Sequence, residues 1–85
     1  MPHELHDKVV IVTGGSGGIG NQIARAFAAT GAKVVITSRG LEKLEKIASQ
    51  IRAKGYTCAA IACDVTDADQ VDRLMRQVID EMGGL

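Results

Sequence analysis

The residues best placed to do chemistry near the start of the chain are the glycines and serine of TGGSGGIG, residues 13–20. They stand between a short apolar run and a segment of helical periodicity. Glycines at such a junction let backbone N–H groups approach an anion, and the helix N-terminus adds partial positive charge. Gly14 is expected to allow a tight turn, Gly18 and Gly20 to leave space for a pyrophosphate, and Ser16 to add a hydroxyl donor. This pattern predicts a dinucleotide site, the alternative being a glycine-rich turn without a ligand. A phosphoryl-transfer loop is disfavoured, because no Gly-Lys-Ser/Thr ends the run.

A second polar position follows the apolar run 34–37. About 20 residues after the glycines, a dinucleotide-binding fold usually carries an acid for the ribose 2′-hydroxyl, but Ser38 and Arg39 stand there instead. A carboxylate would repel a 2′-phosphate, whereas this hydroxyl and guanidinium would accept one, so we predict NADP over NAD. In the alternative, Arg39 is a solvated surface residue. Lys43, one helical turn further along, is a weaker candidate for the same phosphate. The missing acid also disfavours an S-adenosylmethionine-binding domain, which would share the glycine turn.

A third candidate, Asp64, follows the apolar run 58–62. If a pyrophosphate lies on the glycine turn, the adenine lies near this carboxylate, which can accept a hydrogen bond from the exocyclic amine. The backbone of Val65 is expected beside it. In the alternative, Asp64 only organises the start of the next helix, where acids are favoured by the helix dipole. Thr66 and Asp69 have the spacing of a capping box, with Asp in place of the usual Glu, and predict where that helix begins.

The elements that must position these residues alternate along the chain. Three short apolar runs, 9–12, 34–37 and 58–62, each precede a segment with apolar residues at helical spacing. Glycines end each helical segment, at Gly31, Gly55 and Gly83. The order β-α-β-α-β-α predicts the α/β class, with a three-stranded parallel sheet and right-handed crossovers. The first two helices are expected on the same face.

The 85 residues are predicted to form one partial dinucleotide-binding domain, 1–85, with a core that is marginal at this length. We expect the N-terminal half of a doubly wound Rossmann fold; if the full fold continues in that way, a fourth strand must pair with the free edge of the first. No such strand is present, so the run 9–12 is expected to present an unpaired apolar edge that could self-associate. The chain reads as cut, ending one helix after the third strand.

Composition excludes several function classes. Ten Lys plus Arg balance ten Asp plus Glu, and 46% of the residues are hydrophobic. This argues against disorder and against a nucleic-acid binder that works through a basic excess. No apolar run approaches the ~20 residues that span a bilayer, and the N-terminus lacks the features of a secretory signal. We expect a cytoplasmic protein with no membrane partner.

The two cysteines and two histidines are not predicted to form a disulfide or a metal site. Cys58 and Cys63 are an odd number of residues apart in a strand-like segment, so they are expected on opposite faces as reduced thiols. Their spacing matches no zinc pattern, and His3 and His6 lie in a polar N-terminal stretch. No metal site is predicted.

With TGGSGGIG, VVITSR and DVTD in register, residues 8–85 resemble the N-terminal part of the short-chain dehydrogenase/reductase family. The resemblance implies the following cofactor contacts: Gly14, Ser16, Gly17, Gly18, Ile19 and Gly20 at the diphosphate and nicotinamide, Ser38 and Arg39 at the 2′-phosphate, and Asp64 and Val65 at the adenine. The chain departs from the family at one point. Many NADP-using members have a basic residue just before the second motif glycine, and here that position is Gly17. Arg39 therefore carries the NADP prediction nearly alone.

The resemblance also identifies what the 85 residues lack. In the family, an Asn-Asn-Ala-Gly motif and the catalytic serine, tyrosine and lysine lie further along the chain. Tyr56 is the only tyrosine and has no lysine four residues later, so no catalytic residue is assigned. Our hypothesis is the NADP-binding N-terminal portion of an NAD(P)-dependent oxidoreductase acting on a carbonyl or alcohol, inactive as these residues alone. The alternative is a non-catalytic truncated product that folds partly or self-associates without nucleotide. Substrate loops follow later strands, so the sequence names no substrate.

Overall fold

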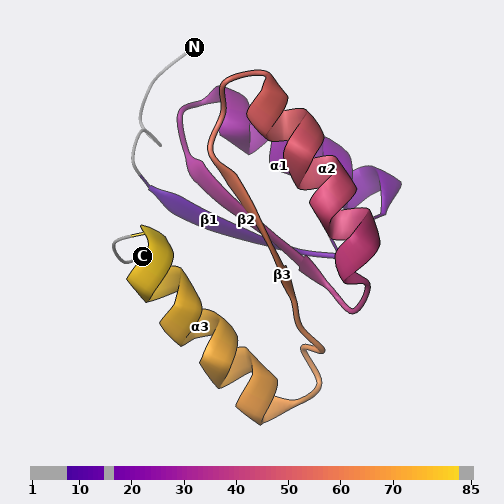
Figure 1. Ribbon diagram of the computed structural model, residues 1–85, viewed down its shortest axis with the longest axis vertical. Coiled ribbons are helices and arrows are strands. Elements are labelled where there is room, and N and C mark those ends of the chain that lie inside the picture. Colours follow the sequence, from indigo (N-terminus) through magenta and orange to yellow (C-terminus); the bar gives the residue numbers. More distant parts are fainter. Residues whose placement is uncertain (1–7, 15–16, 83–85) are drawn as a thin grey trace.

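The computed structural model describes residues 8–14 and 17–82, and in these the strands and helices alternate (Figure 1). The elements are β1 (Val9–Thr13), α1 (Gly18–Ala29), β2 (Lys33–Ser38), α2 (Leu41–Ala53), β3 (Cys58–Ala62) and α3 (Ala68–Met82). The strands form a parallel sheet of order β1-β2-β3. The predicted α/β class and element order are confirmed.

The central strand β2 is buried on both faces. Val34, Val35, Ile36 and Thr37 are all 0% exposed, as expected for a β-branched run between two helical layers. In the register, Thr13 lies beside Thr37, and Ser38 lies beside Ala62. All three strands therefore end at the same level, and the residues that follow them gather at one edge of the sheet.

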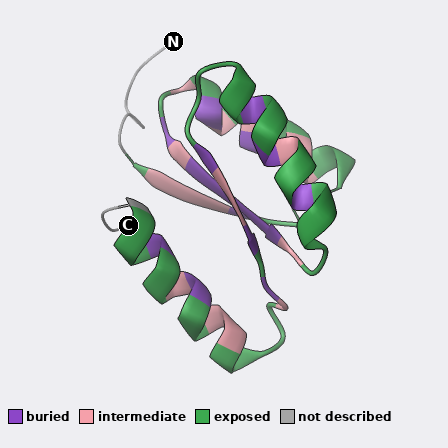
Figure 2. Cartoon of the chain, in the orientation of Figure 1, coloured by how far each residue is buried: buried purple, intermediate pink, exposed green. Residues whose placement is uncertain are grey.

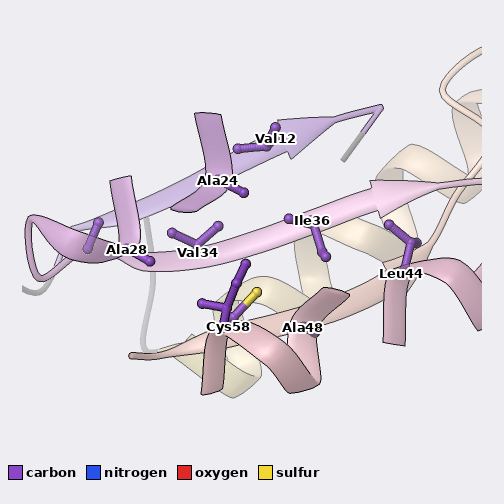
Figure 3. Packing of buried hydrophobic residues seen from close by; sticks show 10 residues of the cluster. Val12, Ala24, Ala28, Val34, Ile36, Leu44, Ala48 and Cys58 are labelled. Carbon is purple, nitrogen blue, oxygen red and sulfur yellow. The ribbon is translucent and has the colours of Figure 1, made fainter. Parts of the chain in front are cut away.

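The helices cover the two faces unequally, with α1 and α2 on one face and α3 alone on the other (Figure 1). On the first face, both helices are buried on part of their surface (Figure 2). The small alanine side chains of α1 let its backbone approach the sheet, and α2 contributes both small and larger side chains (Figure 3). The main members are Ala24, Ala28, Leu44, Ala48 and Ile51. On the second face, Leu74 and Val78 of α3 pack on Val35 and Ile61. The prediction that α1 and α2 share a face is correct.

The two cysteines lie on opposite faces, as predicted. Cys58 packs in the core under α1 and α2, and Cys63 packs under α3. Both are free and buried. Burial raises the pKa of the Cys58 thiol, with the nearby Arg52 guanidinium opposing that rise. In the described residues, no group of three or more metal-ligating side chains comes together. His3 and His6 lie outside them.

The start of α3 differs from its prediction by one residue. The helix is capped by Asp67, whose Oδ1 accepts from the backbone N–H groups of Asp69 (3.0 Å) and Gln70 (3.3 Å). The Gln70 amide also donates to Asp67 Oδ2 (3.1 Å). The predicted capping box of Thr66 and Asp69 is therefore wrong, because Thr66 makes its hydrogen bonds to Asp64 instead.

Strand β1 lies at one edge of the sheet. The Lys8 carbonyl accepts from Lys33 N–H (2.7 Å), and Gly14 N–H donates to the Thr37 carbonyl (2.8 Å). Since backbone groups alternate in direction along a strand, those of the odd-numbered residues Val9 and Ile11 point away from β2. Within the part of the chain that the structure describes, no strand pairs with that side.

Across the described ranges, none of the helices is long and apolar enough to cross a membrane.

Candidate cofactor site

A pocket of about 290 Å³ opens where the three strands end. It is lined by Thr13, Gly14, Thr37, Ser38, Arg39, Cys63, Asp64 and Val65. The glycine turn, the end of β2 and the segment after β3 each contribute to this lining. The structure thus brings together Gly14, Ser38, Arg39, Asp64 and Val65, which the sequence predicted as parts of one site.

The glycine turn is held by backbone hydrogen bonds. Gly14 has φ +70, a left-handed conformation that favours glycine, and its N–H is bonded to β2. Gly17 N–H donates to the Gly14 carbonyl (3.0 Å), which closes the turn. Gly17 then precedes α1 in an extended conformation with no side-chain cap among the described residues, and the first turn holds no acid. This helix start suits an anion. Ser16, the predicted hydroxyl donor, lies outside the described residues.

Gly18 stands at the first position of α1, where the fold itself does not require glycine. Its φ is not positive, and a Cβ built there has no described atom within 4 Å, apart from its chain neighbours and the backbone of α1. As far as the described residues go, the space in front of it is therefore free for a ligand to approach the backbone. Ile19, next in the helix, leaves its side chain 78% exposed, and Gly20 is half-buried. Ile19 is thus available to contact a bound molecule.

Asp64 and Arg39 form an ion pair across the ends of β2 and β3. Arg39 Nη2 lies 3.6 Å from Asp64 Oδ1. The same oxygen accepts from Thr66 Oγ1 (2.7 Å) and from Thr66 N–H (3.0 Å). The Thr66 side-chain hydrogen bond does most to hold the pKa of Asp64 below its usual range; the Thr66 backbone bond and Arg39 add to this. The carboxylate is therefore anionic at neutral pH.

The remaining predicted residues are accessible. The Ser38 hydroxyl oxygen accepts from Gly40 N–H (3.3 Å), which leaves its own proton free to be donated to a ligand. Val65 is 55% exposed. A second, shallower pocket of about 570 Å³ is lined by Ser38, Arg39, Gly40, Leu41, Glu42 and Lys43. Arg39 lines both pockets, with its side chain 77% exposed, and Lys43 lines only the second.

Thr37 also belongs to this site, although it was not among the residues predicted from the sequence. It is 0% exposed, lines the smaller pocket, and its hydroxyl has no hydrogen-bond partner among the described residues. A threonine directly before Ser38 in an apolar strand was the available signal.

We expect Thr37→Val to raise the free energy of unfolding by about 1 kcal/mol, because it replaces a buried unsatisfied hydroxyl by a methyl of similar shape. Urea denaturation measures this as a higher midpoint at unchanged slope. A lower midpoint would show that the hydroxyl does have a partner.

Comparisons with known proteins identify the family. The family model described as short chain dehydrogenase matches residues 8–85. The chain therefore belongs to the short-chain dehydrogenase family, as its motifs predicted. An uncharacterised oxidoreductase of Mycobacterium tuberculosis is 42% identical over 81 residues, covering 92% of this chain and 24% of the relative. A fatty acyl-CoA reductase of Acinetobacter baylyi is 39% identical over 72 residues, covering 85% and 24%.

Solved structures agree on the fold. A citronellol catabolism dehydrogenase of Pseudomonas aeruginosa superposes with a TM-score of 0.91 at 38% identity, covering 98% of this chain and 35% of that one. A metagenomic short-chain oxidoreductase in complex with NADP has a TM-score of 0.86 at 38% identity, covering 93% and 36%. The three strands are thus part of a Rossmann fold. The chain spans about a quarter to a third of the length of these four proteins.

Proposed function

We propose that this chain is the NADP-binding portion of an oxidoreductase that acts on a carbonyl or alcohol. The observation that carries the proposal is the meeting of three groups at the strand ends: a glycine turn with an uncapped helix start, a guanidinium and a carboxylate. These are the groups needed for a diphosphate, a 2′-phosphate and an adenine, respectively. Family membership and an NADP-bound structural neighbour support the same reading.

The described residues fit such a cofactor. The free space at Gly18 would admit the diphosphate to the N–H groups of α1, with Gly14, Gly17 and Gly20 shaping the turn around it. Arg39 and Ser38 would take the 2′-phosphate. When bound, NADPH supplies the hydride, and this chain would hold and orient the cofactor for that transfer. The acid–base groups and the substrate pocket are not assigned to these 85 residues.

The direct test is to titrate NADPH, and NADH in parallel, while following thermal unfolding of the chain. A ligand that binds only the native state stabilises it by RT ln(1 + L/Kd), where L is the free ligand concentration, so Tm rises with ligand concentration and with affinity. We expect a larger Tm increase with NADPH than with NADH. A cooperative transition that neither nucleotide shifts would refute the proposal.

Gly18→Ala separates the cofactor role from folding. The fold has room for the added methyl, and alanine is the better helix former, so we expect the free energy of unfolding to be unchanged or slightly raised. The same methyl occupies the space that a diphosphate needs, so we expect affinity for both NADPH and NADH to fall by about tenfold or more. Calorimetric titration and urea denaturation of the same variant measure the two effects. Equal nucleotide affinities in Gly18→Ala and the parent chain would contradict this placement.

The edge position of β1 favours a second candidate, self-association without nucleotide. Sedimentation that depends on protein concentration, with no response to either nucleotide, would support it over the first. For location we propose the cytoplasm, since two free, buried thiols suit a reducing compartment.

A further inference from the structure

Arg39 and Asp64 leave the sheet side by side. Ser38 of β2 lies beside Ala62 of β3, and Cys63 N–H donates to the Ser38 carbonyl (2.8 Å). This bond extends the pairing one residue beyond β3. The next residue on each segment is Arg39 or Asp64, so the register itself brings the opposite charges to 3.6 Å.

The two partners differ in how firmly they are held. Asp64 is held through both its side chain and its backbone. Thr66 donates two hydrogen bonds to Asp64 Oδ1, and the Asp64 N–H donates to Gln70 Oε1 (2.9 Å). Arg39, in contrast, has a side chain that is 77% exposed, and its one ion pair in the described residues is to Asp64. A ligand that competes for this pair will therefore move the arginine and leave the carboxylate in place.

We propose that Asp64 acts as a fixed counter-ion that limits the affinity of Arg39 for a 2′-phosphate and so sets the selectivity between NADP and NAD. This inference rests on the proposed function. Without ligand, the carboxylate holds the guanidinium. With ligand, it remains a few ångströms from the phosphate dianion and repels it. Both effects oppose binding of the 2′-phosphate, whereas any adenine contact of Asp64 acts equally on NADPH and NADH.

The ratio of the two affinities isolates this effect. We would measure the Kd of NADPH and of NADH for the parent chain and for Asp64→Asn by calorimetric titration. Asparagine keeps the Oδ1 acceptor for Thr66 but removes the charge. A lost adenine contact weakens both nucleotides alike and cancels in the ratio. We expect the preference for NADPH to rise about 2- to 5-fold, the range for an exposed ion pair, and the rise to shrink near 1 M salt.

Asp67→Asn is the matched control. It removes the same charge from the same turn, but from a carboxylate whose hydrogen bonds go to Asp69 and Gln70, and asparagine also caps helices well. We expect the ratio of NADPH affinity to NADH affinity in Asp67→Asn to stay near that of the parent chain. In an Arg39→Leu background, Asp64→Asn should change the ratio less, since the pair is already broken.

The unsubstituted chain offers a second measurement. The carboxyl pKa of Asp64, followed by NMR, should be higher with adenosine 2′,5′-bisphosphate bound than with 5′-AMP bound. The 2′-phosphate draws the cation away and adds a negative charge, and both raise a carboxyl pKa.

The outcomes distinguish the two proposals. If the parent chain binds NADPH but neither the ratio nor the Asp64 pKa changes as stated, the counter-ion role is overturned and the proposed function stands. An affinity ratio that rises equally in Asp64→Asn and Asp67→Asn also overturns the counter-ion role, because the rise then comes from the lower net negative charge of the turn and not from the pair with Arg39. If the parent chain binds neither nucleotide, both proposals fail.

Discussion

Arg39→Asp is expected to weaken NADPH binding by about 100-fold and to leave NADH binding unchanged or stronger. A charge-assisted hydrogen bond is worth about 1.5–3 kcal/mol, and the substitution replaces it by repulsion between a carboxylate and the 2′-phosphate. The new carboxylate can instead accept a hydrogen bond from the 2′-hydroxyl of NADH. It also stands beside Asp64 without a cation, which further disfavours a phosphate. Direct titration of both nucleotides measures the two affinities.

The control for Arg39→Asp is the same charge reversal elsewhere. Lys46 is exposed on α2 and is not one of the residues that line either pocket, so Lys46→Asp should change NADPH affinity little beyond long-range electrostatics. Lys43→Asp tests the weaker candidate, because Lys43 lines the second pocket beside Arg39. Equal losses in the Arg39 and Lys46 variants would show that net charge, and no specific contact, governs binding.

Ile36→Ala is expected to lower the free energy of unfolding by about 2–5 kcal/mol. Ile36 is 0% exposed in the central strand and packs in the core beneath α1 and α2 (Figure 3). Truncation removes buried methyl groups and leaves a cavity that the sheet cannot close. The free energy of unfolding of a small domain is about 5 kcal/mol or little more, so this variant should be partly unfolded at room temperature. Urea denaturation followed by circular dichroism measures the loss.

Ile79→Ala is the matched comparison, because it removes the same atoms from an isoleucine on α3 that is 51% exposed. We expect it to change the free energy of unfolding by about 0.5 kcal/mol or less. Similar losses in the two variants would mean that the core does not lie where the structure places it. Excess NADPH should partly restore the folded population of Ile36→Ala, because ligand binding favours the native state.

Local pattern determined most of the architecture. The β-branched runs, the helical spacing of apolar residues and the glycines after each helix predicted six elements in the correct order. They also predicted the opposite faces of Cys58 and Cys63, since side chains alternate along a strand. The gathering of Gly14, Arg39 and Asp64 followed from one further rule: parallel strands present their carboxyl ends at the same edge.

Only the tertiary structure decided how those residues meet. Sequence reasoning gave Arg39 and Asp64 separate ligands, but the register of β2 against β3 makes them an ion pair. The N-cap of α3 likewise could not be assigned from the sequence, because both Thr66 and Asp67 can accept hydrogen bonds from the first N–H groups of the helix. In the structure Thr66 is hydrogen-bonded to Asp64, and Asp67 caps the helix. Thr37 has a hydroxyl without a described partner because helices cover both faces of its strand. Such contacts depend on distances between segments far apart in the chain, which periodicity within one segment does not contain.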